Sequence, residues 1–161
     1  LEAIGEADLI LLGPGSLYTS IIPNLLVDGV VRAIVEADAP KIYVCNIMTQ
    51  DGETEGYTAA DHLEALMAHG APGLVDLCLA NSTPVQSSLV ARYRREDAAP
   101  LVVDRERVLA MGLELVERPI AMEGGDFARH DPDKLAQAIL EVYRQRAVRI
   151  FRGTRRYILE E

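Results

Sequence analysis

Residues 9–20 constrain the fold of this chain more than any other segment, because an apolar stretch runs directly into a loop rich in glycine and hydroxyl residues. Leu9–Leu12 predicts a strand, and the loop that follows reads Gly13-Pro14-Gly15-Ser16-Leu17-Tyr18-Thr19-Ser20. We expect Ser20 to cap a helix with Pro23 in its first turn, where a missing N–H breaks no helical bond. The free N–H groups of such a loop, together with the helix dipole, suit a phosphate. An ordinary strand-to-helix turn is the alternative interpretation.

Strand-like and helix-like segments alternate along the rest of the chain. Further strands are predicted at 41–47, 74–80, 100–103 and 115–122, and helices at 21–37, 58–70, 82–95, 104–111 and 131–146. Thr58 begins a capping box, and Pro119 places the last strand at a sheet edge. This alternation predicts an α/β fold, specifically a Rossmann-like, doubly wound, mainly parallel sheet with helices on both faces.

Composition restricts the classes of partner. The chain has 161 residues, enough for one domain, and a formal net charge of −9. So acidic a domain is not expected to bind nucleic acid, and it would have to bind an anionic ligand locally, through backbone N–H groups and a few arginines. No apolar run approaches the ~18 residues of a membrane span, and the start has no signal-peptide pattern.

The ends of the chain and its cysteines lead to further expectations. Cys45 and Cys78 lie in apolar runs and are predicted to be buried free thiols, which fits a reducing cytoplasm. Because the first residue is Leu1 rather than Met, we expect a fragment of a longer polypeptide. We divide the chain into an α/β domain at 1–145 and an arginine-rich extension of unknown structure at 146–161.

Polar side chains follow the predicted strands at their carboxyl ends, where open α/β sheets bind ligands. Asn46, Thr49 and Gln50 offer neutral donors and acceptors suited to a sugar, a ribose or a base edge. Arg129 has a planar guanidinium that matches the oxygens of a diphosphate. His130 either assists Arg129 or simply sits at a helix N-terminus. Solvated loop side chains are the alternative interpretation of each.

Metal and catalytic chemistry is less clearly indicated. Asp51 and Glu53 can be proposed to hold Mg²⁺ or a ribose hydroxyl pair, although loop carboxylates are more often solvated. No spacing of Cys and His supports a zinc site, and no hydrolase or P-loop lysine motif is present. His62 and His69 are expected at the surface or the core edge. We therefore predict no metal site and assign no catalytic residue.

With these residues in view, the chain resembles the family that contains 2-phospho-L-lactate transferase (CofD) and the bacterial gluconeogenesis factor YvcK, and in particular the YvcK branch. The matching segments are Ala7–Ile10, Gly13–Val27, Cys45–Gln50, Gly52–Thr54, Asp61-His62 and Arg129-His130-Asp131. The resemblance implies a Rossmann-like fold of roughly twice this length. It also implies that this chain is the C-terminal half, because the family's Gly-Gly-Gly-Thr-Gly phosphate loop is absent.

The resemblance also implies a set of ligand contacts. Carried over by position, these are Gly13, Gly15, Ser16, Asn46, Thr49 and Arg129. The polar loops themselves add Pro14, Thr19, Gln50 and His130. The ligand implied is a UDP-sugar or another nucleotide, with Mg²⁺ as a candidate cofactor.

Three functions follow as hypotheses. In the first, the protein is a UDP-sugar-binding regulatory protein of the YvcK type, acting in carbon metabolism during gluconeogenic growth, cell-wall synthesis and cell shape. In the second, it is a phospholactyl-type transferase that uses a guanosine diphosphate donor, a deazaflavin acceptor and Mg²⁺. In the third, the acidic domain mainly serves oligomerisation, for example as a homodimer.

Overall fold

The computed structural model describes the backbone of residues 1–158 and the side chains of residues 1–146. Its centre is a four-stranded parallel sheet in the order β1-β2-β3-β4. The strands are β1 (Ile10–Leu12), β2 (Lys41–Val44), β3 (Leu77–Asn81) and β4 (Glu114–Arg118). The mainly parallel sheet expected from the alternating pattern is confirmed.

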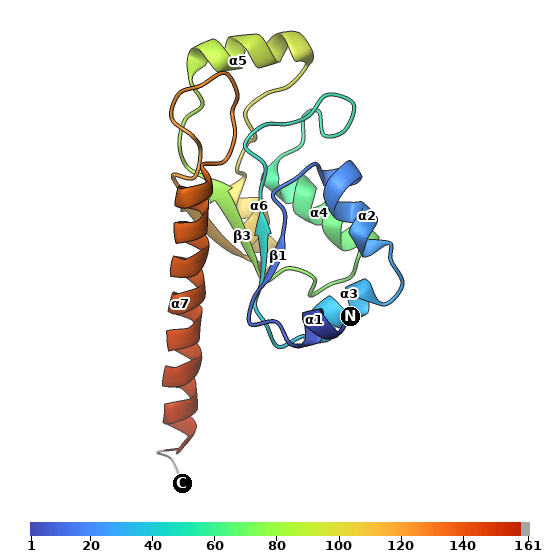
Figure 1. Cartoon of the computed structure of the whole chain (residues 1–161), viewed down its shortest axis with the longest axis vertical. Helices are drawn as coiled ribbons and strands as arrows, with labels where there is room; N and C mark the ends of the chain where they lie inside the picture. The colour runs from blue at the N-terminus through green and yellow to red at the C-terminus, as the bar shows by residue number, and fades with distance from the viewer. Residues whose placement is uncertain (159–161) are drawn as a thin grey trace.

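Helices cover both faces of this sheet (Figure 1). One face carries α2 (Ile22–Leu25), α3 (Val30–Glu36), α4 (Ala59–His69) and α6 (Arg105–Ala110), and the other carries α7 (Pro132–Ile158). The short helix α1 (Glu2–Gly5) lies against α3, and α5 (Ser87–Tyr93) lies beyond the carboxyl end of β3. Helices on both faces are what the α/β pattern predicts.

Two cores result from the alternation of side chains along the strands. Tyr43 and Cys78 face the core under α4, whereas Ile42 and Leu79 face the core under α7. All four side chains are fully buried, because helices cover the sheet on both sides. Cys45 is buried and free as well, so both cysteines are as expected.

The helix predicted at 21–37 is wrong as one continuous element. A π-helical turn begins earlier, at Leu17–Ile21, and continues into α2. The chain then turns at Gly29, whose φ of 81° lies in the left-handed region that glycine adopts readily, before α3 begins. Ser20 is therefore not the N-cap, since it lies inside the π turn, and Ser16 precedes that turn without a side-chain capping bond.

Two other elements differ from their predictions. Residues 100–103 form no strand; Leu101 N–H donates to the Ile47 carbonyl, and only single bridges form beside it. The helix predicted at 82–95 is shorter, with α5 followed by a 3₁₀ turn at Arg94–Glu96. Its expected start is held in a turn, because the Asn81 side chain bonds both the N–H and the carbonyl of Thr83.

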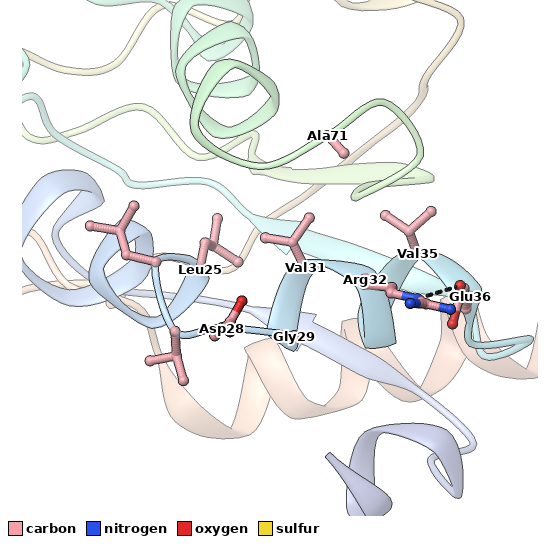
Figure 2. Close-up of a pocket in the computed structure, with 10 residues that line it drawn as sticks. Leu25, Asp28, Gly29, Val31, Arg32, Val35, Glu36 and Ala71 are labelled. Carbon is pink, nitrogen blue, oxygen red and sulfur yellow. Dashed lines mark hydrogen bonds and ion pairs between the residues drawn. The ribbon is translucent and has the colours of Figure 1, made fainter.

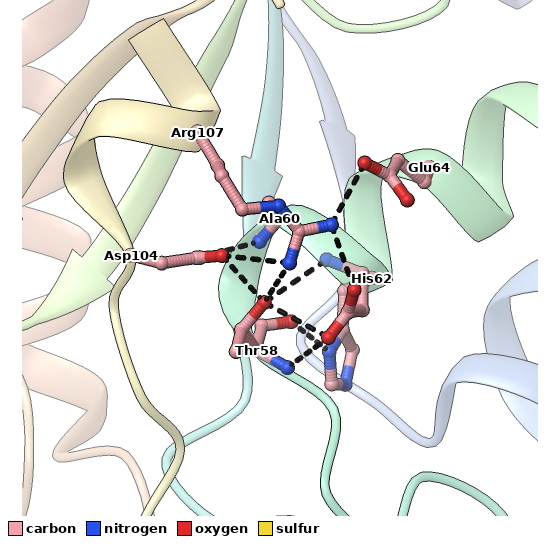
Figure 3. A network of polar contacts seen from close by, with 7 residues as sticks. Thr58, Ala60, His62, Glu64, Asp104 and Arg107 are labelled. Carbon is pink, nitrogen blue, oxygen red and sulfur yellow. Dashed lines mark hydrogen bonds and ion pairs between the residues drawn. The ribbon is translucent and has the colours of Figure 1, made fainter. Parts of the chain in front are cut away.

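The predicted capping box of α4 is confirmed, and it also joins α4 to α6. Thr58 and Asp61 form the capping box of α4. Asp104, at the N-cap of α6, accepts a bond from the Thr58 hydroxyl at 2.7 Å. Arg107 then contacts Asp61, Glu64 and Asp104 (Figure 3). Arg107 is about half exposed, and exposed ion pairs contribute little to the free energy of unfolding. The network therefore mainly fixes the position of α4 relative to α6.

The last helix is longer than predicted. Asp131 caps α7 by accepting bonds from the N–H groups of Asp133 and Lys134, and Pro132 occupies the first turn, as expected. The helix continues past the predicted end near Arg146 to Ile158. The expected division at 145/146 stays a prediction, and residues 159–161 of the extension lie outside the described residues.

Among the described helices, no single one has the length and apolar character to cross a membrane. The helical segments 17–25 and 30–36, which are bent relative to each other, meet that test only when they are taken together.

His62 is more deeply buried than expected. Its ring is fully buried against Tyr43 and Tyr57, and its Nδ1 donates to the Thr58 carbonyl at 2.9 Å. The remaining nitrogen, Nε2, is buried with no hydrogen-bond partner. Burial lowers the pKa of His62, because a charged imidazole there would lose its hydration. His62 is thus held neutral in the core.

This lowered pKa predicts that acid destabilises the fold. As the pH falls below about 6.5, the unfolded chain binds a proton at His62 that the folded chain does not, so the free energy of unfolding should fall. Above that pH the group should have no effect. Urea unfolding at pH 7.5 and 5.5 measures the change in the free energy of unfolding between these two pH values. This change should be smaller in His62→Gln and unaltered in the exposed control His69→Gln. Equal pH dependence in both variants would contradict this role of His62.

Candidate nucleotide site

The carboxyl ends of β1 and β2 open into a cavity of about 540 Å³. It is lined mostly by residues that the sequence proposes as ligand contacts, namely Pro14, Gly15, Ser16, Asn46, Thr49, Gln50, Arg129 and His130. Ile47, Met48, Tyr93 and Ala128 complete the lining. Four segments far apart in the sequence therefore meet where a parallel sheet is expected to bind a ligand.

Two of the proposed contacts, Gly13 and Thr19, do not line this cavity. Gly13 has a φ of 88°, and a Cβ there would lie 3.0 Å from the Val44 carbonyl oxygen, so its role is to let the loop pass close to β2. Thr19 donates from its hydroxyl to Glu53 Oε1 at 2.8 Å on the exposed side of the π turn. The structure therefore gives neither residue a place at the cavity.

The loop after β1 is held to the loop after β2. Gln50 Nε2 donates to the Ser16 hydroxyl oxygen at 2.9 Å, and Gln50 N–H donates to the Thr54 hydroxyl at 2.9 Å. The backbone N–H groups of Gly15 and Ser16 have no hydrogen-bond acceptor within the described residues. This wall thus presents two free N–H groups and a hydroxyl whose hydrogen is available to a ligand.

Thr49 reaches the cavity but its hydroxyl is already used. Its Oγ1 accepts from Ala99 N–H at 2.9 Å and lies 3.3 Å from the Ala99 carbonyl oxygen, and the residue is only 5% exposed. The prediction that this hydroxyl contacts a ligand is therefore not supported. Its role is to pin the segment that contains Ala99 against the loop after β2.

Arg129 and Tyr93 also line the cavity. The Arg129 guanidinium lies 4.9 Å from the centre of the Phe127 ring and makes no ion pair with any side chain among residues 1–146. The guanidinium of Arg92 lies 4.7 Å from the centre of the same ring. Tyr93, which sequence reasoning missed, accepts a bond from Ala128 N–H at 3.2 Å. Its position depends on this long-range contact, for which the local sequence carries no signal.

His130 supplies an acceptor rather than a charge. Its Nε2 lies 3.1 Å from the Cys45 carbonyl oxygen, so Nε2 carries the hydrogen and Nδ1 is left with its lone pair. Burial lowers the pKa of His130, and the contact with the Cys45 carbonyl opposes this effect only in part. The interpretation in which His130 adds a second cation beside Arg129 is therefore not favoured.

The described residues do not form a complete Mg²⁺ site by themselves. Asp51 is exposed, and Glu53 uses Oε1 to accept from Thr19 while its Oε2 is buried without a partner. Within the searched part of the chain, no three side chains among His, Cys, Asp and Glu are grouped so as to hold a metal.

A second hollow, of about 440 Å³, lies between α2, α3 and Ala71 (Figure 2). Its inner side chains are apolar, among them Leu25, Val31 and Val35, and its rim carries the Arg32–Glu36 ion pair at 2.8 Å. None of the proposed ligand contacts lines it. The cavity above β1 and β2 is therefore the candidate site.

Comparison with known proteins identifies the family. The family model of 2-phospho-L-lactate transferase CofD matches residues 1–121. The chain belongs to the CofD family. Within this family it is similar to the gluconeogenesis factor of Halalkalibacterium halodurans, with 48% identity over 141 residues, and to that of Bacillus subtilis, with 44% identity over 145 residues.

Solved structures of the family agree with the fold. A Bacillus halodurans protein of the UPF0052 family superposes with a TM-score of 0.83 at 47% identity, covering 86% of this chain and 44% of that one. The matches to the two gluconeogenesis factors cover 88% and 90% of this chain but 44% and 46% of those proteins. The chain thus spans less than half the length of these relatives. These shares do not locate the match along the relatives, so the C-terminal position stays a prediction.

Proposed function

We propose that the cavity above β1 and β2 forms part of a binding site for a UDP-sugar. We further propose that the protein is a nucleotide-sugar-binding regulator of the YvcK type. The observation that carries the proposal is the convergence of free Gly15 and Ser16 N–H groups, the Asn46–Gln50 loop and Arg129 on one cavity. N–H groups and a guanidinium suit diphosphate oxygens, and amides suit hydroxyls and base edges.

The cellular role belongs to the same proposal. CofD-family relatives with 44–48% identity are called gluconeogenesis factors, which supports a role in carbon metabolism. We extend this role to cell-wall synthesis and cell shape because nucleotide-linked sugars feed wall assembly, and we place the protein in the cytoplasm, acting on its own or as a homodimer.

The proposal is tested by calorimetric titration of the full-length natural protein with UDP-N-acetylglucosamine, UDP and GDP. We expect micromolar binding of the uridine ligands without added metal, because the described cavity contributes hydrogen-bond donors and a guanidinium rather than metal ligands. A protein that binds GDP with Mg²⁺ and ignores both uridine ligands would refute this proposal.

A transferase is the second candidate, and the description of the matching family model favours it. It predicts turnover with a deazaflavin acceptor when a guanosine diphosphate donor and Mg²⁺ are supplied. Product formation, followed by mass spectrometry, would establish an enzyme. Binding of UDP-N-acetylglucosamine without turnover would leave the regulator.

A further inference from the structure

A smaller cavity, of about 180 Å³, adjoins the candidate site at the carboxyl end of β3. The two cavities share Asn46 and Ile47 as lining residues. The smaller one is otherwise lined by Asn81, Ser82, Thr83, Pro84, Val85, Pro100, Leu101 and Val103. The two cavities are therefore neighbours that meet at Asn46 and Ile47.

Both walls of the smaller cavity are fixed by the fold. Asn81 Oδ1 accepts from the N–H groups of Thr83 and Ala121, each at 3.1 Å, and its Nδ2 donates to the Thr83 carbonyl. In the segment 99–101, Leu101 N–H donates to the Ile47 carbonyl, and Ala99 N–H donates to the Thr49 hydroxyl. The cavity is thus formed before a ligand arrives, which lowers the entropic cost of binding.

The chemistry of the smaller cavity differs from that of the larger one. None of its lining residues is charged, whereas the larger cavity contains Arg129. The hydroxyls of Ser82 and Thr83 and the amide of Asn46 have no side-chain hydrogen bond to any described residue. Pro100 and Leu101, which also line this cavity, are apolar. A lining that combines hydroxyls, an amide and apolar side chains suits a neutral ring that carries hydroxyl groups.

We propose that this smaller cavity is the sugar subsite, in which the uncharged sugar of a nucleotide-linked sugar lies beyond Asn46 while the diphosphate stays beside Arg129. The inference rests on the proposed function and deepens it, because it assigns separate residues to the two parts of the ligand. It makes Thr83 a specificity-determining residue for the sugar and not for the nucleotide.

The test compares two probes, UDP-N-acetylglucosamine and UDP, on the full-length natural protein and its Thr83→Val variant. Valine keeps the shape of threonine but removes the hydroxyl. We expect the variant to bind UDP-N-acetylglucosamine about 3- to 10-fold more weakly, the effect of one neutral hydrogen bond, and to bind UDP unchanged. Thr19→Val is the matched control, since Thr19 lies outside both cavities, and it should leave both affinities unchanged.

A second variant tests the subsite if Thr83→Val changes the affinity too little to measure. Ser82→Leu places a larger side chain in the subsite and should weaken UDP-N-acetylglucosamine binding further without affecting UDP. Equal loss for both probes, or no loss for either, would overturn the subsite while the proposed function stands. If the unaltered protein binds neither probe, the proposed function itself fails.

Discussion

Replacing Arg129 by alanine should weaken the binding of UDP-N-acetylglucosamine by about 10- to 100-fold. The guanidinium lines the candidate cavity, makes no ion pair with any described side chain and lies over the Phe127 ring, so it is free to bind phosphate. Loss of a hydrogen bond to a charged group costs about 1.5–3 kcal/mol, which corresponds to this range of affinity. UDP should lose affinity equally, because the effect belongs to the diphosphate.

Two further variants separate the geometry of Arg129 from its charge. Arg129→Lys keeps the charge but not the planar pair of donors, and it should recover only part of the affinity. Arg32→Ala removes the same charge from α3, where Arg32 pairs with Glu36 outside the candidate cavity, and it should bind normally. If the Arg129→Ala variant binds UDP-N-acetylglucosamine with native affinity, Arg129 does not contact the ligand.

Replacing Leu79 by alanine should lower the free energy of unfolding by about 2–5 kcal/mol. Leu79 lies on the inner strand β3, is fully buried and packs in the core that joins the sheet to α7. Its truncation removes apolar contacts and leaves a void that a sheet fixed on both sides cannot close. Because domains are stable by only about 5–15 kcal/mol, this loss is large. Chemical denaturation monitored by circular dichroism measures it.

The matched control is Leu109→Ala on α6. It is the same chemical change at a side chain that is 48% exposed, and it should cost less than about 1 kcal/mol. A similar loss of stability in the two variants would show that burial under α7 is not what makes Leu79 important.

The sequence predicts the inner strands β2 and β3 well because they are short apolar runs that helices cover on both sides. The run Ile42–Val44 is fully buried, as expected. The prediction of one helix at 21–37 fails because apolar spacing does not show where a chain turns. Its apolar residues keep a helical spacing across Gly29, but Leu26 is 68% exposed, so the apolar stripe does not continue along one packed face. Spacing alone cannot reveal that a glycine turns the chain.

The candidate site shows the same division between local and long-range information. Gly15, Ser16 and Arg129 are identifiable because loops at the carboxyl ends of parallel strands converge. The bonding of Thr49 and the place of Tyr93 are not, since they depend on partners distant in sequence, Ala99 and Ala128. A side chain's residue type predicts what it can bond, whereas only the fold decides which of its bonds are already made.

The free edge of the sheet has a consequence for how such a chain behaves in solution. Within the described residues β1 pairs only with β2, and Leu11 on it is 44% exposed. Its three residues are all apolar, with no lysine, proline or bulge to discourage a neighbour. Wherever this edge is uncovered, two copies can join into one longer sheet through backbone hydrogen bonds, without any recognition between side chains. A segment that lies against β1 would therefore block this route to aggregation.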